Sequence, residues 1–185
     1  MGFLADRMFL TKGVGRSKER LTSFEAALRD AGIARYNLVM ISSIFPPGCK
    51  VIPRAQGEKY LRPGEVVHCV MARTETNEPN RLVAASIGVA IPRDATQFGY
   101  LSEHHCYGMT EKAAGDYAED LAAQMLASTL GVPFDLDTDW DERKEQFKVG
   151  REIVTTRHIT QSAEGDKNGL WTSVLAAAVL IGEWR

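Results

Sequence analysis

Cysteine is scarce in this chain of 185 residues, with only Cys49, Cys69 and Cys106 present and none of them adjacent to another. This excludes a disulfide framework and a zinc site built on paired thiolates. Long apolar runs are also missing: the longest, Val174–Ile181, has eight residues, whereas a membrane span needs about 20. The first residues do not have the pattern of a signal peptide. We therefore expect a cytoplasmic protein that does not enter a membrane.

An excess of positive charge is absent too. The 22 Lys and Arg residues against 24 Asp and Glu residues leave a formal net charge of −2. Such a balance gives no basic surface of the kind that binds nucleic acids or anionic membranes, so neither partner is expected. The apolar fraction of 44% and the charged fraction of 25% are ordinary for a globular protein. The length predicts a single domain, residues 1–185.

Apolar and β-branched segments alternate with two helical patterns. A helix is predicted over 23–31, where Thr22–Glu25 has the form of a capping box. A longer one is predicted between Thr110 and Gly131, with an apolar stripe at helical spacing. These elements predict an α+β domain built in layers. Strands are predicted over 8–12, 36–44, 51–52, 66–72, 82–91, 99–106, 155–161 and 171–181.

Three short motifs have ordinary explanations that we prefer. Gly13-Val14-Gly15 among basic residues could hold an anion, but it lacks the full phosphate-loop pattern, and a solvated loop is favoured. The acidic repeat at 135–139 resembles the start of a calcium loop without its required glycine and glutamate. His104-His105-Cys106 are metal-ligand types, but neighbouring strand residues face opposite ways. No metal site is predicted.

The pair Ser42-Ser43 is the strongest functional signal. It interrupts an apolar strand and is followed at once by Pro46-Pro47-Gly48, with Asn37 six residues before Ser43. Two hydroxyl groups in a core strand need hydrogen-bond partners or a chemical purpose.

At these residues the chain resembles the pyruvoyl-dependent arginine decarboxylases. The resemblance runs from about Phe9 to the C-terminus. Its segments are Ala31-Gly32-Ile33, Asn37-Leu38-Val39, Ile41-Ser42-Ser43-Ile44-Phe45-Pro46-Pro47, Ala85-Ser86-Ile87-Gly88-Val89-Ala90-Ile91-Pro92 and Leu101-Ser102-Glu103.

The resemblance implies that the chain cuts itself between Ser42 and Ser43. Ser43 would attack the carbonyl carbon of Ser42, and the amide of Asn37 would stabilise the oxyanion. The products would be a β chain, residues 1–42, and an α chain, residues 43–185, that begins with a pyruvoyl group made from Ser43. This covalent cofactor would form a Schiff base with L-arginine and accept electrons as CO2 leaves, giving agmatine. Glu103 would donate the proton that replaces CO2.

The same resemblance implies a stacked αββα sandwich that forms trimers, or a dimer of trimers, with active sites between subunits. Glu25 matches the position of the family's acidic residue that contacts the guanidinium group of the substrate, and a carboxylate suits that contact. The family residue is aspartate, so the side chain here is longer by one methylene. Its membership of the capping box is a competing structural explanation.

Two other functions stay open at this stage. The chain could be a non-catalytic or unprocessed relative that acts as a trimeric binding module. It could also be a pyruvoyl decarboxylase for another amino acid, such as ornithine, lysine or aspartate, because motifs indicate a reaction type better than a substrate.

Overall fold

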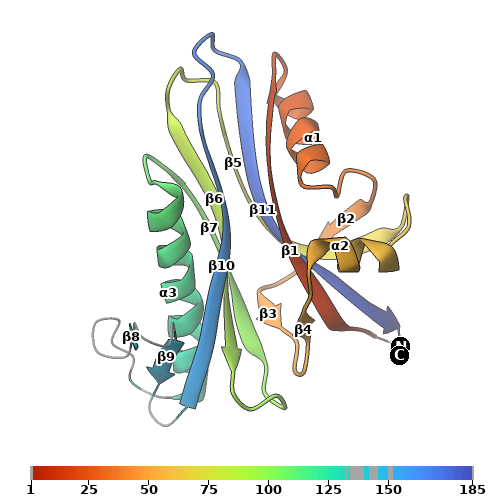
Figure 1. Ribbon diagram of the computed structural model, residues 1–185, viewed down its shortest axis with the longest axis vertical. Helices are drawn as coiled ribbons and strands as arrows, with labels where there is room; N and C mark the ends of the chain where they lie inside the picture. The colour runs from red at the N-terminus through yellow and green to blue at the C-terminus, as the bar shows by residue number, and fades with distance from the viewer. Residues whose placement is uncertain (1, 132, 134–139, 142–145, 150–151, 185) are drawn as a thin grey trace.

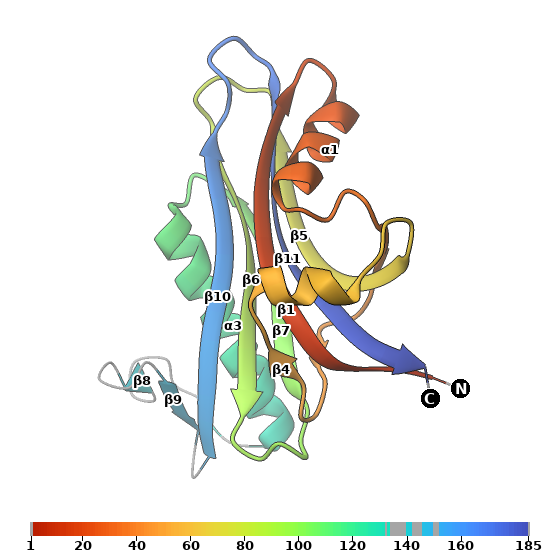
Figure 2. The same ribbon diagram turned by 45° about the vertical axis from the view of Figure 1, so that its right-hand side comes forward.

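The computed structural model describes residues 2–131, 133, 140–141, 146–149 and 152–184. Two β-sheets pack face to face, and one long helix lies on the outer face of each (Figures 1 and 2). The order of layers is therefore helix, sheet, sheet, helix, as expected for the αββα sandwich. The acidic repeat at 135–139 lies outside the described residues.

Sheet A has five strands in the order β2-β5-β11-β1-β4. Its strands are β1 (Phe3–Ser17), β2 (Asn37–Met40), β4 (Lys50–Val51), β5 (Val66–Thr76) and β11 (Trp171–Trp184). The long central strands β1 and β11 pair antiparallel from Phe3↔Trp184 to Ser17↔Trp171. The short β2 pairs parallel to β5 and forms one edge of the sheet.

Sheet B has six strands in the order β3-β7-β6-β10-β9-β8. Its strands are β3 (Ile44–Phe45), β6 (Leu82–Pro92), β7 (Gly99–Tyr107), β8 (Trp140–Asp141), β9 (Gln146–Val149) and β10 (Glu152–Glu164). The two-residue β3 pairs antiparallel with β7 and forms the edge of this sheet.

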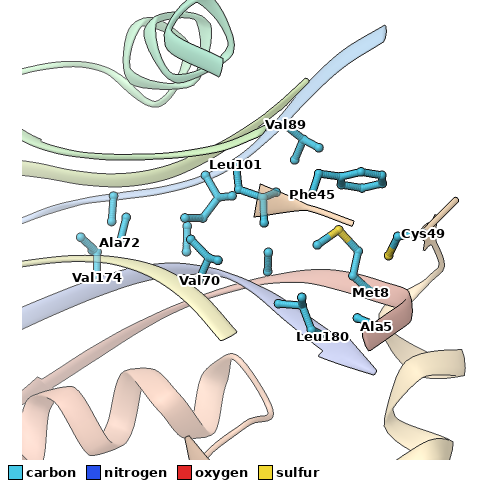
Figure 3. Close-up of a cluster of buried hydrophobic side chains, with 14 of the residues drawn as sticks. Ala5, Met8, Phe45, Cys49, Val70, Ala72, Val89, Leu101, Val174 and Leu180 are labelled. Atoms are coloured by element: carbon cyan, nitrogen blue, oxygen red, sulfur yellow. The ribbon is translucent and has the colours of Figure 1, made fainter. Parts of the chain in front are cut away.

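The main core lies between the two sheets (Figure 3). The longest apolar run of the chain lies in strand β11, whose two faces are both buried. Val174, Ala176, Ala178 and Leu180 face sheet B, whereas the alternate residues from Leu175 to Ile181 face α1. Because both faces of the strand are covered, every position in the run is apolar.

The helices cover the outer faces. Helix α1 (Arg20–Asp30) packs on sheet A, and α3 (Glu111–Leu130) packs on sheet B. Thr110 caps α3 by accepting a hydrogen bond from the amide of Ala113, and Gly131 ends it in the left-handed conformation. The connection after β4 holds the short α2 (Arg54–Gly57) and the 3-10 turn η1 (Glu58–Tyr60).

Two local predictions are wrong. Gly13 and Gly15 belong to β1, not to a solvated loop. Glycine is needed at both positions because a Cβ atom there would collide with backbone atoms of α1. These glycines allow the helix to approach the sheet closely. The capping box is not formed either: Glu19 is the N-cap of α1 without a side-chain cap, and Ser23 instead bonds to Ser173 at 2.7 Å.

Within the described residues, no helix is long and apolar enough to cross a membrane. In the same part of the chain, no three histidine, cysteine, aspartate or glutamate side chains gather into a group that could hold a metal ion.

Candidate active site

The chain crosses from one sheet to the other at residues 41–43. Strand β2 ends at Met40 on the edge of sheet A, and β3 begins at Ile44 on the edge of sheet B (Figure 1). The amide of Ile41 still bonds to the carbonyl oxygen of Cys69 in sheet A at 3.0 Å. The carbonyl oxygen of Ser43 already accepts from the amide of Leu101 in sheet B at 2.8 Å. The bond between Ser42 and Ser43 therefore lies in the short link between two anchored ends.

A tight turn surrounds this bond. The amide of Ile44 donates a hydrogen bond of 3.0 Å to the carbonyl oxygen of Ser42, which closes a three-residue turn with Ser43 at its centre. Among the described residues, Asn80 is the one non-glycine residue with positive φ, so the turn uses ordinary backbone conformations. The prediction of a continuous strand over 36–44 is thus wrong at the serine pair, because the chain leaves one sheet before it joins the next.

The serine side chains are accessible. Ser42 is exposed and Ser43 is half-buried, and within the described part of the chain neither hydroxyl group makes a hydrogen bond. The prediction of two serines inside a core strand is therefore wrong, although the core residue Phe45 follows the pair after one exposed residue, Ile44. A hydroxyl group without a competing partner is free to turn towards a neighbouring carbonyl group.

Asn37 begins β2, and its side-chain amide donates to the carbonyl oxygen of Gly64 at 2.7 Å. This bond ties β2 to the loop that leads into β5. No hydrogen bond joins Asn37 to Ser42 or Ser43 among the described residues.

Glu103 lies on β7, two residues after Leu101, and therefore shares the face of Leu101 that looks towards sheet A. Glu103 is exposed as a whole residue, but burial of part of its surroundings raises the pKa of its carboxyl, while the positive charge of nearby His105 opposes that rise. Burial raises the pKa of the Cys69 thiol to about 11, and the negative charge of Glu103 adds a smaller part of that rise. Glu103 is therefore near Cys69, whose carbonyl oxygen accepts the hydrogen bond from the amide of Ile41.

Glu25 lies elsewhere. It is on α1, which covers the outer face of sheet A, and its carboxylate forms an ion pair of 2.8 Å with Arg29 one turn later. Within the described residues no contact joins it to Ser43 or Glu103.

Comparison of the sequence with known proteins shows the family to which the chain belongs. Residues 7–185 match the family model of pyruvoyl-dependent arginine decarboxylase. The chain belongs to the pyruvoyl-dependent arginine decarboxylase family. A probable pyruvoyl-dependent arginine decarboxylase of Chloroherpeton thalassium is 61% identical over 98% of this chain and all of its own length. A pyruvoyl-dependent arginine decarboxylase of Nitrosopumilus maritimus is 54% identical over 98% of this chain and 99% of its own. A third relative, from Methanosarcina mazei, is 54% identical over 95% of this chain and 96% of its own.

Membership in the pyruvoyl-dependent arginine decarboxylase family makes the protein an enzyme, a lyase that releases CO2 from arginine and depends on a covalently bound pyruvoyl group. The residues at the crossing fit such a group. A pyruvoyl group is made from a serine of the chain itself, and Ser43 combines a free hydroxyl group with a neighbouring carbonyl group that already accepts a hydrogen bond.

One feature of this candidate site escaped the sequence analysis, namely the hydrogen bond that the backbone amide of Ile44 donates to Ser42. A backbone donor has no residue-type signal, because every residue except proline carries one. The nearest hint was Pro46-Pro47, which requires the chain to turn soon after the serines.

Proposed function

We propose that the chain cleaves itself between Ser42 and Ser43 and then decarboxylates L-arginine to agmatine. The observation that carries this proposal is the hydrogen bond from the amide of Ile44 to the carbonyl oxygen of Ser42, at 3.0 Å. It supplies a donor aimed at the oxygen atom on which negative charge develops during attack. Backbone donors of this kind stabilise such oxyanions in acyl-transfer reactions generally.

The cleavage balances with residues of the chain and one water molecule. The Ser43 hydroxyl attacks the carbonyl carbon of Ser42 and the C–N bond breaks, which converts the amide into an ester. Elimination across the Cα–Cβ bond of residue 43 then expels the carboxylate of Ser42 and leaves a dehydroalanine. Addition of water releases ammonia and leaves the pyruvoyl group at the start of residues 43–185. The β chain, residues 1–42, keeps the new carboxylate.

In the decarboxylation, the pyruvoyl ketone supplies an electron sink for the bond that CO2 leaves. The protein must then deliver a proton to the substrate carbon. Glu103 suits this role because partial burial raises the pKa of its carboxyl, which keeps the proton available nearer to neutral pH. In this proposal Asn37 orients β2, and so the Ser42 side of the bond, through its bond to Gly64.

Substrate binding by Glu25 requires a second copy of the chain. Glu25 lies on α1, on the outer side of sheet A, whereas Glu103 lies exposed on β7 of sheet B. Exposed apolar side chains flank the serine pair and the adjoining edge strand: Val39, Met40, Ile44 and Val66. An edge of this kind is typical of a surface that another subunit covers. The arrangement supports an assembly of several copies, in which Glu25 of one copy reaches the Ser43 and Glu103 of the next; the family resemblance implies a trimer of αβ units, alone or paired into a hexamer.

We also propose that the enzyme works in the cytoplasm. Cys49, Cys69 and Cys106 are all free thiols, which supports a reducing compartment.

The deciding experiment is the intact mass of the purified protein under denaturing conditions. Cleavage gives fragments of 42 and 185 − 42 = 143 residues, and the larger fragment resists Edman sequencing because it has no amino group. Ser43→Ala should stay intact and inactive, whereas Ser128→Ala, which removes an exposed hydroxyl on α3, should be cleaved normally. An intact wild-type chain after long incubation would instead favour the unprocessed binding module.

Substrate choice is tested by comparing kcat/KM for arginine, ornithine, lysine and aspartate. Glu25→Gln should raise KM for arginine by about tenfold or more, since it removes a charge-assisted pair with the guanidinium group. Cleavage should be unaffected. An unchanged KM would remove Glu25 from the substrate site, and a preference for another amino acid would replace arginine.

A further inference from the structure

A cavity of about 340 Å³ lies at the C-terminal end of α1, away from the serine pair. It is lined by Arg29, Gly32, Ala34, Arg35, Arg54 and Glu58. Three guanidinium groups and one carboxylate therefore surround the same space, and the excess charge is positive.

The three arginines use the same atom for their internal contacts. Arg29 donates through Nε to Glu25 at 2.8 Å, and Arg54 donates through Nε to Glu58 at 2.6 Å. Arg35 donates through Nε to the hydroxyl oxygen of Tyr36 at 3.0 Å. Within the described residues, neither Nη atom of Arg29 and neither Nη atom of Arg35 makes a hydrogen bond. A guanidinium group that is fixed through Nε presents its Nη atoms ready to bind an oxyanion.

Arg35 is the clearest case because its charge has no carboxylate partner among the described residues. Its guanidinium group also lies over the ring of Tyr36, 5.2 Å from the ring centre. Tyr36 is itself buried, so the stacking holds Arg35 in one direction at the rim of the cavity. This is an exposed cation whose position is set in advance, and fixing a group in its bound position lowers the cost of binding.

An alternative explanation is that the arginines only neutralise the carbonyl groups at the end of α1. Arg54 does this, since its Nη1 donates to the carbonyl oxygen of Asp30 at 3.3 Å. Arg29 and Arg35 make no such contact within the described part of the chain. Arg29 still lies in the last turn of α1, where a positive charge suits the helix dipole, so this explanation covers Arg54 and Arg29 and leaves Arg35.

We propose that this cavity, the arginine pocket, binds a phosphate oxyanion, either free phosphate or the phosphate group of a small ester. Phosphate matches the planar fork of a guanidinium group and can accept from several at once. Binding here does not depend on the proposed cleavage, since the pocket is formed by segments that lie outside the crossing at residues 41–43.

The test is isothermal titration of the purified protein with inorganic phosphate and, separately, with glycerol 3-phosphate, at ionic strength held constant with sodium chloride. Saturable binding is expected, weakened by about tenfold or more in Arg35→Gln and further in Arg29→Gln/Arg35→Gln. Arg81→Gln, which removes an arginine beside Glu78 in the connection between β5 and β6, is the matched control and should bind as wild type.

Tighter binding of glycerol 3-phosphate identifies an ester as the ligand, and equal binding identifies free phosphate. If neither probe gave a heat of binding that reached saturation, the proposal would be overturned. Equal affinity of wild type and the double variant would overturn it too. Because Arg35 is exposed, its variant should melt at the wild-type temperature, which separates lost binding from lost folding. Ser43→Ala should bind phosphate normally, so a failure of self-cleavage would not be mistaken for a failure of this site.

Discussion

The amide of Ile44 and the carbonyl oxygen of Ser42 face each other across Ser43, 3.0 Å apart. The bond that the chain is proposed to cut is thus held inside a hydrogen-bonded turn before any chemistry begins. A donor already in position needs no reorganisation when charge appears on the oxygen atom, and that is the condition under which such donors accelerate acyl transfer most.

Ile44→Pro should therefore slow self-cleavage by about 100-fold or more, because proline has no amide proton to donate. The measurement is the fraction of cleaved chain against time by denaturing electrophoresis. Ile44→Val keeps the donor and should mature as wild type. Cleavage of a folded Ile44→Pro chain at the normal rate would assign the oxyanion to another donor, with Asn37 the first candidate.

Glu103→Gln should leave cleavage intact and lower kcat by about 10²- to 10⁴-fold, the usual contribution of a positioned general acid. Glutamine keeps the shape of the side chain but cannot deliver a proton. The two readouts are intact mass and CO2 release from arginine. An uncleaved Glu103→Gln chain would assign this residue to maturation instead.

His105→Gln should move the alkaline limb of the pH–activity profile to higher pH. A proton donor must be protonated, so activity falls as pH rises through the pKa of Glu103. Burial raises that pKa and the His105 cation lowers it, and removing the cation therefore lets the pKa rise further. The profile is measured as kcat/KM against pH. A shift to lower pH would mean that the limb belongs to another group.

Gly13→Ala should destabilise the protein by about 1–3 kcal/mol, the typical cost of overpacking. The new Cβ would collide with the backbone of α1 at Ala27 and Ala31, so helix and sheet would have to move apart. Thermal unfolding measures the effect. Gly2→Ala, whose new Cβ would meet no atom within 4 Å, is the control and should melt as wild type.

Glu119→Gln should make stability less dependent on pH. Glu119 belongs to α3, and its Oε1 atom lies 3.7 Å from Nε2 of His158 on β10. Burial raises its pKa, the Thr156 hydroxyl and the charge of His158 oppose that rise, and Asp116 and Asp120 add smaller increases.

The direction of this effect follows from linkage. The unfolded chain releases the Glu119 proton near pH 4.5, whereas the folded chain releases it at higher pH, so wild type loses stability as pH rises through that interval. Glutamine cannot lose a proton. The Tm of the variant relative to wild type should therefore rise between pH 4 and pH 7, by about 2–4 °C per kcal/mol. An equal rise in the exposed control Glu78→Gln would refute this explanation.

Much of the fold could be predicted from the sequence because its strongest patterns are local. The long helix with Thr110 and Gly131 at its ends was confirmed, as were the apolar strands on either side of it. Gly13 and Gly15 misled the prediction because glycine serves equally in loops and in strands that a helix approaches closely. That distinction depends on α1, which is a partner in space.

The candidate site also has parts that the local sequence predicts and parts that depend on contacts in space. The serine pair could be found because residue types carry its chemistry, and the resemblance added Glu103 and Glu25. The turn at Ser43 could not be predicted, since it results from the chain leaving the edge of one sheet and joining the edge of another. The separation of Glu25 from Glu103 is likewise a property of layers, which neither residue reveals alone.

Strand β1 lies in the interior of sheet A, between β11 and β4, yet it precedes Ser42, while both neighbours follow Ser43. If the proposed cut occurs, sheet A contains interleaved strands from two separate polypeptides, which can dissociate only when the sheet unfolds. Folding of a single subunit, which is unimolecular in the precursor, would then require two polypeptides to meet. The mature enzyme should consequently unfold at a temperature that depends on protein concentration and recover poorly on dilution, so that the precursor has one opportunity to fold before the cut makes its assembly permanent.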